Sequence, residues 1–377
     1  MPNAEIPFLD LKQQYLALEP EIRTAVQGVL TSTQYILGPE VRKFEEEFAL
    51  AHNASHCVGT NNGTSSLHLA LWALGIEAGD EVILPVNTFI ATAEAVALCG
   101  AIPVLVDHDE YFNIDPARIE AAITSKTKAV IAVHLYGQSA QMPQIKAITK
   151  AHGLFLIEDA AQAHLAMFDG KFIGSWGDAT CFSFYPGKNL GAYGEAGAVL
   201  TSNSELAERM KTLRDHGSEQ KYNHVMMGHN YRMEALQAAI LRVKLSHLAE
   251  WTANRRERAS WYHEGLCAIS QIQCPNVHSL ANPVWHLYVI RAEQREELQA
   301  HLTKEGVATG LHYPVPLNRQ PAFAPYQSAK KSYPCSDSSV EKLLSLPMFP
   351  ELTEKQSQRV INVIRSFYQS VDSKSQL

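Results

Sequence analysis

Short apolar runs alternate with helix-like segments between about residues 55 and 200, and this alternation constrains the fold more than any other feature. The runs read "HCVGT", "DEVILP", "IPVLVD", "KAVIAVHLYG" and "LFLIEDAAQ". Such runs, separated by amphipathic helices, indicate βαβ units and a parallel sheet covered on both faces. We therefore predict an α/β fold with a mostly parallel sheet, whose ligands bind at the carboxyl ends of the strands.

Beyond this region, the pattern predicts a second, smaller unit. The chain has 377 residues, which is long for a single hydrophobic core. Residues 233–266 carry apolar positions at helical spacing and predict one or two long helices. A strand-like "VWHLYVIRA", a helix-like "REELQAHLTKEG" and a last helix over about residues 353–370 follow. We expect a large domain over 1–250, including an N-terminal helical segment, and a small α+β domain over 251–377.

Charge and composition exclude several classes of protein. A net charge of −7 argues against a protein that holds nucleic acid by bulk charge. The start of the chain, "MPNAEIPFLDLKQQY", lacks the pattern of a signal peptide, and the apolar runs are too short to span a bilayer. We expect a cytoplasmic protein with no membrane partner.

The cysteines are scattered and form no CxxC pair. This spacing argues against a metal site and against disulfides, and it fits a reducing compartment. We expect most of them to be small buried side chains. They are Cys57, Cys99, Cys181, Cys267, Cys274 and Cys335.

One lysine, Lys188, lies among glycines in "CFSFYPGKNLGAYGEAGAVL". It is a surface charge, a phosphate-binding P-loop lysine or a nucleophile. A P-loop requires Ser or Thr after the lysine and a glycine six positions before it, whereas this chain has Asn189 and Phe182 there. The P-loop interpretation is therefore excluded.

Strand ends elsewhere in the chain supply partners for Lys188. Asp159 and Gln162 follow a buried strand, where a carboxylate requires a partner such as a cationic ligand nitrogen. Taken alone, Asp159 could equally be a helix N-cap. Residues 59–66, "GTNNGTSS", offer backbone N–H groups at a helix start, and Phe89 presents a flat ring. Together these groups match pyridoxal phosphate, which requires a lysine, a carboxylate at its pyridine nitrogen and phosphate donors.

The whole chain resembles the DegT/StrS-type sugar-nucleotide aminotransferases, which have the aspartate aminotransferase fold. The motifs that carry the resemblance are "QYILGPEVRKFEEEFA", "NNGTSSLHLAL", "PVNTFIATAEAV", "VHLYGQ", "IEDAAQAH", "SFYPGKNLG", "GHNYRMEALQAAIL", "HYPVPLNRQP" and "SLPMFPEL". The resemblance implies a seven-stranded, mostly parallel sheet in the large domain, pyridoxal 5′-phosphate as cofactor, and a homodimer with shared active sites.

The resemblance also assigns cofactor contacts. Lys188 corresponds to the Schiff-base lysine and Asp159 to the partner of the pyridine nitrogen. Gln162 corresponds to a residue near the ring and its 3′ oxygen, and Phe89 to the residue that covers the other ring face. The phosphate would be held by Gly63, Thr64, Ser183 and, from the neighbouring subunit, Asn230.

Four further residues match positions that line the nucleotide-sugar pocket in relatives: Tyr185, Tyr222, His312 and Tyr313. For Tyr222, packing within the fold is an equal alternative. The chain departs from the "GDGG" of many relatives at Glu195 and Ala196, where we expect little effect on the reaction. Some relatives that are dehydratases carry histidine in place of the lysine, so Lys188 favours transamination.

The implied reaction moves an amino group from L-glutamate, giving 2-oxoglutarate, to a keto sugar on a nucleoside diphosphate. The "HYPVPLNRQPAF" segment is closer to relatives that act at C3, which favours a dTDP-3-keto-6-deoxyhexose or a UDP-2-acetamido-3-keto sugar. The product would serve surface polysaccharide, such as lipopolysaccharide O-antigen, or a glycosylated metabolite. The alternatives are a 4-keto-sugar or cyclitol aminotransferase, and a non-catalytic regulatory protein of the same fold.

Overall fold

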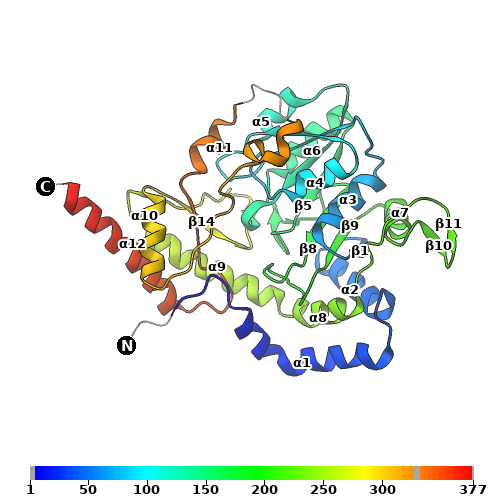
Figure 1. Ribbon diagram of the computed structural model, residues 1–377, viewed down its shortest axis with the longest axis horizontal. Helices are drawn as coiled ribbons and strands as arrows, with labels where there is room; N and C mark the ends of the chain where they lie inside the picture. Colours follow the sequence, from blue (N-terminus) through cyan, green and yellow to red (C-terminus); the bar gives the residue numbers. More distant parts are fainter. Residues whose placement is uncertain (1–4, 327–331, 376–377) are drawn as a thin grey trace.

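A seven-stranded sheet forms the centre of the fold in the computed structural model, which describes residues 5–326 and 332–375 (Figure 1). Its order is β1-β9-β8-β5-β4-β2-β3. The strands are β1 (His56–Thr60), β2 (Glu81–Pro85), β3 (Ile102–Val106), β4 (Thr127–Val133), β5 (Phe155–Asp159), β8 (Ala179–Ser183) and β9 (Gly197–Thr201). Strand β9 runs antiparallel to both of its neighbours, β1 and β8, and the other neighbouring strands pair in parallel. The predicted α/β fold with a mostly parallel sheet is confirmed.

Alternate residues of each strand enter two different cores, because side chains of a strand point to opposite faces. Val82 and Leu84 belong to one core, whereas Ile83 between them belongs to the other. Cys181 and Phe182 are divided in the same way. Both faces are therefore buried, which explains why these strands are continuous apolar runs in the sequence.

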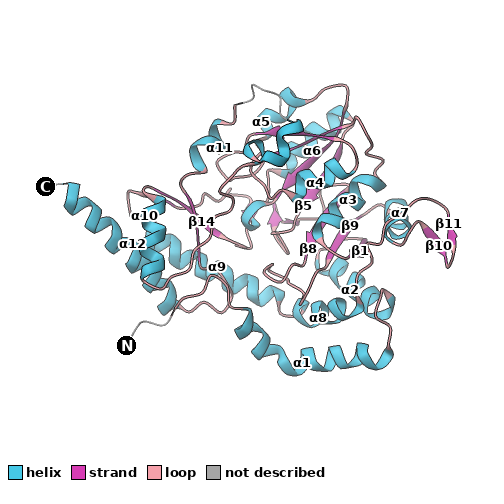
Figure 2. Ribbon diagram, viewed as in Figure 1, coloured by secondary structure: helices cyan, strands magenta, loops and turns pink. Residues whose placement is uncertain are grey.

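Helices cover both faces of this sheet (Figure 2). They are α1 (Leu11–Ser32), α2 (Gly38–Ala51), α3 (Gly63–Ala73), α4 (Ala91–Leu98), α5 (Pro116–Ile119), α6 (Met142–His152), α7 (Ser204–Arg214) and α8 (Ala235–Leu245). Both α1 and α2 pack on α8, below the sheet in Figure 1. Among the described helices, none combines the length and the apolar character needed to cross a membrane.

A third core lies in the C-terminal part of the chain. It gathers side chains of α9 (Leu248–Leu266), α10 (Arg295–Lys304) and α12 (Glu354–Ser375) around a small sheet, and Ile6 from the start of the chain joins it. That sheet contains β12 (Ile272–Gln273), β14 (Tyr288–Ala292) and β15 (Leu343–Leu346). The helices predicted over residues 233–266 and near the C-terminus are confirmed. The division into domains at residue 250 falls inside α9 and stays a prediction.

The remaining elements are short. The strands are β6 (Met167–Phe168), β7 (Lys171–Phe172), β10 (Ser218–Gln220), β11 (Asn223–His224) and β13 (Ala281–Asn282). The helices are α11 (Pro334–Ser339) and the 3₁₀ helices η1 (Glu120–Ala122), η2 (Leu135–Gly137), η3 (Leu317–Arg319) and η4 (Pro321–Tyr326). The hairpin of β10 and β11 extends from the body of the molecule at the right of Figure 1.

One sequence prediction about the cysteines is wrong. Cys267 and Cys274 form a disulfide, whereas Cys57, Cys99, Cys181 and Cys335 are free. The turn from α9 into β12 brings the Cα atoms of the pair to 5.8 Å, within the range that a disulfide spans. A spacing of seven residues carries no such signal in the sequence, because the pairing depends on how the strand returns along the helix.

Candidate active site

A cavity of about 870 Å³ lies at the carboxyl ends of β5 and β8, where parallel α/β sheets bind their ligands. The structure brings most of the predicted site residues together around it. Those that line the cavity are Gly63, Thr64, Phe89, Asp159, Gln162, Ser183, Tyr185, Lys188, His312 and Tyr313.

Asp159 is the last residue of β5 and is buried on the cavity side. Its Oδ2 accepts a hydrogen bond from Thr92 Oγ1 at 2.8 Å, and its Oδ1 accepts one from the backbone N–H of Ala161 at 3.2 Å. Burial nevertheless raises the pKa of the Asp159 carboxyl above its ordinary value. A protonated ring nitrogen of a ligand would be the charge partner that this carboxylate lacks.

Lys188 lies on the turn after β8, where its backbone N–H donates to the carbonyl of Tyr185 at 2.8 Å. Burial lowers the pKa of its ammonium group to about 8, although the nearby Asp159 opposes this shift. This shift increases the share of Lys188 that is neutral, to about a tenth at pH 7. A neutral amine is the form that attacks an aldehyde and accepts protons.

One glycine near Lys188, Gly191, is required by the turn itself. A Cβ placed on Gly191 would lie 2.2 Å from the carbonyl oxygen of Pro186. No side chain fits at that distance, so the close approach that requires glycine is between two backbone segments.

A candidate phosphate site lies where α3 begins, at the edge of the cavity. Because the helix starts at Gly63, the N–H groups of Gly63 and Thr64 have no intrahelical partner and are available to an anion. A Cβ on Gly63 would lie 2.6 Å from Cβ of Ser183, so only glycine allows the helix start to lie this close to the end of β8. Asn62 caps the helix by accepting from the N–H of Ser65 at 2.8 Å.

Gln162 is fixed by hydrogen bonds at both ends of its amide. Its Oε1 accepts from the backbone N–H of Tyr136 at 2.6 Å, and its Nε2 donates to Tyr313 Oη at 3.2 Å. The ring of Tyr313 lies 5.6 Å from that of Phe89, between centroids. Phe89 is 52% exposed and lines the cavity, so its ring face is open to a planar ligand.

The remaining predicted residues at the cavity are His312 and Tyr185, and both carry rings. His312 shares a hydrogen bond of 2.8 Å between its Nδ1 and Ser345 Oγ, and its ring stacks on Phe8. Burial, assisted by the charge of Lys188, lowers the pKa of His312 to about 4. His312 is therefore neutral at neutral pH. Tyr185 is 56% exposed at the cavity.

Asn230 and Tyr222 do not line the cavity of their own chain. Tyr222 lies between β10 and β11 and is 83% exposed. Asn230 is exposed, and its Oδ1 accepts a hydrogen bond from Arg232 Nε at 3.0 Å. The prediction that Asn230 acts from a neighbouring subunit concerns a second chain, and it stays a prediction. The role of Tyr222 in binding the nucleotide sugar also stays a prediction.

The sequence analysis missed two residues that position the predicted ones. Thr92 donates a hydrogen bond to Asp159. The sequence offered a signal for it, because a buried hydroxyl near the start of the apolar helix α4 requires a hydrogen-bond partner. Tyr136 holds Gln162 with its backbone N–H and has a positive φ of 61°. No pattern in "VHLYGQ" predicts this positive φ.

The chemistry of these residues fits pyridoxal phosphate. The chain presents a lysine of lowered pKa, a buried carboxylate of raised pKa, an exposed ring face and a helix start whose first N–H groups have no intrahelical partner. These are the groups that hold the cofactor's aldehyde, pyridine nitrogen, ring and phosphate. The arrangement is that of a pyridoxal phosphate-dependent transferase.

A comparison with family models agrees with this site. Residues 17–365 match the DegT/DnrJ/EryC1/StrS aminotransferase family, and the chain belongs to it. The enzymes of this family use pyridoxal phosphate, and this chain is an aminotransferase.

Curated relatives match nearly the whole chain. A "Pleiotropic regulatory protein" of Geobacillus stearothermophilus is 47% identical, over 96% of this chain and 98% of its own length. A "dTDP-3-amino-3,4,6-trideoxy-alpha-D-glucose transaminase" of Streptomyces venezuelae is 45% identical, over 97% of each chain. A UDP-N-acetyl-3-dehydro-alpha-D-glucosamine 3-aminotransferase of Acidithiobacillus ferrooxidans is 45% identical, over 96% of this chain and 98% of its own.

A solved structure is equally similar. The crystal structure of DesV from Streptomyces venezuelae, in complex with a ketimine intermediate, superposes with a TM-score of 0.95. The two sequences are 45% identical, and the match covers 97% of this chain and 99% of that one.

Proposed function

We propose that this aminotransferase moves an amino group from L-glutamate to the C3 keto carbon of a nucleotide-linked sugar. The observation that carries the proposal is that Lys188, Asp159 and the start of α3 at Gly63 line one cavity. The relatives from Streptomyces and Acidithiobacillus, named as C3 amino-sugar enzymes, support the position of amination.

Different residues of the chain have separate roles in the proposed reaction. When bound, pyridoxal phosphate supplies an electron sink for the carbanion formed at the substrate carbon. Lys188 Nζ, with a pKa of about 8, would hold the cofactor and, when free, would take up the proton that leaves the substrate carbon. Asp159 would keep the pyridine nitrogen protonated, and Thr92 keeps the carboxylate oriented.

The groups around Lys188 and Asp159 bind the cofactor. Gly63, Thr64 and Ser183 hold the cofactor phosphate, joined by Asn230 of a second copy in a homodimer. Phe89 covers one face of the ring, and Gln162, fixed by Tyr136, lies near the 3′ oxygen.

The acceptor sugar occupies the mouth of the cavity. Tyr185, His312 and Tyr313 offer rings and neutral donors there, which suits the hydroxyl groups of a sugar and the base of a nucleotide. Tyr222 would contribute from the hairpin. Two acceptor classes fit: a dTDP-3-keto-6-deoxyhexose and a UDP-2-acetamido-3-keto sugar. The product would serve amino-sugar biosynthesis for surface polysaccharide or a glycosylated metabolite, in the cytoplasm.

A panel of acceptors tests this function. The holoenzyme is incubated with glutamate and, separately, with 3-keto and 4-keto sugars on dTDP and UDP and with a keto cyclitol, and the products are identified by mass spectrometry. Amination of a 3-keto sugar is expected. A product only from a 4-keto sugar or from the cyclitol would contradict the C3 assignment.

A half-reaction separates catalysis from a purely regulatory role, as the name of the Geobacillus relative makes relevant. Excess glutamate without an acceptor should convert the visible absorbance of the bound cofactor to that of its amine form and release 2-oxoglutarate. A regulator that only binds the cofactor would leave the spectrum unchanged. The presence of Lys188, with its lowered pKa, favours the catalytic outcome.

A further inference from the structure

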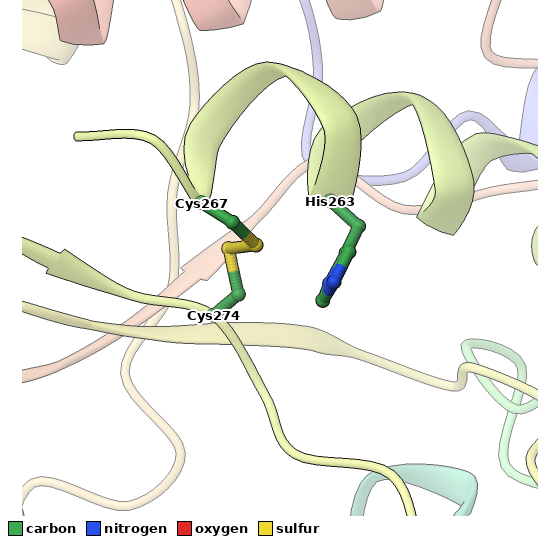
Figure 3. A group of neighbouring side chains, drawn as sticks. All are labelled: His263, Cys267 and Cys274. Atoms are coloured by element: carbon green, nitrogen blue, oxygen red, sulfur yellow. A yellow bond between two sulfur atoms is a disulfide. The ribbon is translucent and has the colours of Figure 1, made fainter.

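Three side chains that can ligate a metal meet outside the active-site cavity, at the end of α9 and just after β12. His263, Cys267 and Cys274 each offer one donor atom, and these atoms all lie within 4.8 Å of one another. Figure 3 shows the imidazole and the two cysteine side chains directed to the same side of the helix end. The cavity proposed to bind the cofactor is lined by none of them.

Two rigid elements hold the three donors. His263 and Cys267 are four residues apart at the C-terminal end of α9, so they occupy the same helix face one turn apart. Cys274 directly follows β12, whose pairing with β14 fixes the returning strand. The donors are therefore placed by backbone hydrogen bonds that do not depend on the disulfide.

The spacing and chemistry suit a soft or borderline divalent cation. Tetrahedral zinc, with Zn–S of about 2.3 Å and Zn–N of about 2.0 Å, places neighbouring ligand atoms about 3.5–3.8 Å apart. That separation lies within the 4.8 Å limit found for these atoms. The negative end of the α9 dipole at Cys267 also favours a cation there.

The environment leaves room for an ion. His263 and Cys267 are exposed, whereas Cys274 is buried. In the part of the chain that the structure describes, no side-chain hydrogen bond or ion pair occupies the His263 ring. A fourth coordination position would therefore face solvent, as in zinc sites with three protein ligands and a water.

We propose that His263, Cys267 and Cys274 bind one zinc ion when the two cysteines are reduced. The structure shows the alternative state, in which the same sulfur atoms form a disulfide (Figure 3). A dithiol or phosphine reductant supplies two electrons, and two protons are taken up, to give two thiols. Zinc then displaces both thiol protons and takes the imidazole nitrogen as its third ligand. The disulfide and the zinc complex exclude each other.

Zinc binding by the full-length holoenzyme tests this proposal. The protein is kept in a phosphine reductant and titrated with zinc against a chromophoric chelator, and cobalt is used in parallel for the thiolate-to-metal absorbance. We expect one zinc per chain in the wild type. Cys274→Ser should lose the site and the cobalt band, and His263→Ala should weaken affinity by about tenfold or more.

Matched controls make the result decisive. Cys335→Ser removes a free cysteine elsewhere and should leave zinc binding unchanged. Oxidised wild-type protein should bind no zinc at this site. Equal zinc binding by wild type and Cys274→Ser would overturn the proposal, and so would a disulfide that stays closed in excess reductant. Thermal unfolding of each variant identifies any that fails to fold, in which case Cys267→Ser replaces it.

Discussion

Two neighbouring carboxylates at the end of β5 face opposite sides of the sheet and have opposite surroundings. Glu158 is fully buried and accepts hydrogen bonds from His134 Nε2 at 3.0 Å, from the N–H of Gly177 at 2.8 Å and from Thr180 Oγ1 at 2.9 Å. Asp159 faces the cavity and has two donors. One carboxylate is satisfied within the protein, whereas the other is left for a ligand.

The pKa values of the two groups express this difference. Burial alone would raise the pKa of Glu158, but its hydrogen bond to His134 and its other donors outweigh burial and lower it. For Asp159 burial outweighs Thr92, Ala161 and Lys188, and the pKa is raised. A buried carboxylate that the protein itself does not stabilise is typical of a binding site, whereas one with a full set of donors is structural.

The largest expected effect is on catalysis, at the side of the sheet that faces the cavity. Lys188→Ala should lower amino transfer by about 10⁴-fold or more, because it removes both the amine that holds the cofactor and the proton carrier. The visible absorbance of the covalently held cofactor should disappear with it. Product formation and the absorbance spectrum measure the two effects. Lys128→Ala, at an exposed position of β4, is the control and should retain both. Turnover by Lys188→Ala near the wild-type rate would contradict the assignment.

The next effect compares Asp159 with its neighbour. Asp159→Asn should lower activity by about 10²–10³-fold, since an amide no longer holds the proton on the pyridine nitrogen. The cofactor-free variant should be at least as stable as the wild type at neutral pH, because a buried charge has been removed. Steady-state kinetics and thermal unfolding test the two statements. A large loss of stability without cofactor would show that Asp159 is structural, like Glu158.

Glu158→Gln should give the converse result. We expect a loss of about 2–3 kcal/mol in the free energy of unfolding, because several donors lose a charged acceptor. Activity of the folded fraction should fall far less than in Asp159→Asn. Chemical denaturation measures the first and kinetics below the unfolding temperature the second. Equal loss of activity in both variants would remove the distinction between the two sides of β5.

The pH dependence of stability should also differ in sign. Glu158 has a lowered folded-state pKa, so its contribution is present above its ordinary pKa of about 4.5 and is lost as the pH falls further. Asp159 has a raised folded-state pKa, so the cofactor-free protein loses stability as the pH rises from about 4 through that pKa. Thermal unfolding of wild type and both variants from pH 3 to 7 gives the two difference curves. Curves of the same sign would contradict the two pKa shifts.

The smallest effect tests how Asp159 is oriented. Thr92→Val removes one hydrogen bond and should lower activity by about three- to tenfold, equivalent to about 0.5–1.5 kcal/mol. It should also raise the pKa of Asp159 further, because the Thr92 hydrogen bond lowers it. The pH profile of the rate measures this shift. Thr92→Ser restores the hydroxyl and should restore both; a Ser variant as impaired as Val would point to packing instead.

The sequence alone predicted the order of strands and helices around the sheet, since apolar runs and helical periodicity are local properties of the chain. It also placed Asp159, Lys188 and the Gly63 helix start at strand or helix ends, and the fold brings such ends together at one edge. The resemblance to relatives supplied Tyr185, His312 and Tyr313, which no local pattern distinguishes from core packing.

Only the tertiary structure decided which side chains meet across long separations in the chain. Thr92 donates a hydrogen bond to Asp159, which lies sixty-seven residues later in the chain, and the backbone N–H of Tyr136 donates to Gln162. The disulfide of Cys267 and Cys274, with His263 beside it, depends on the path of one turn and on the pairing of β12 with β14. A hydrogen bond or a shared ligand is fixed by distances of a few ångströms, and the packing of the whole chain sets those distances.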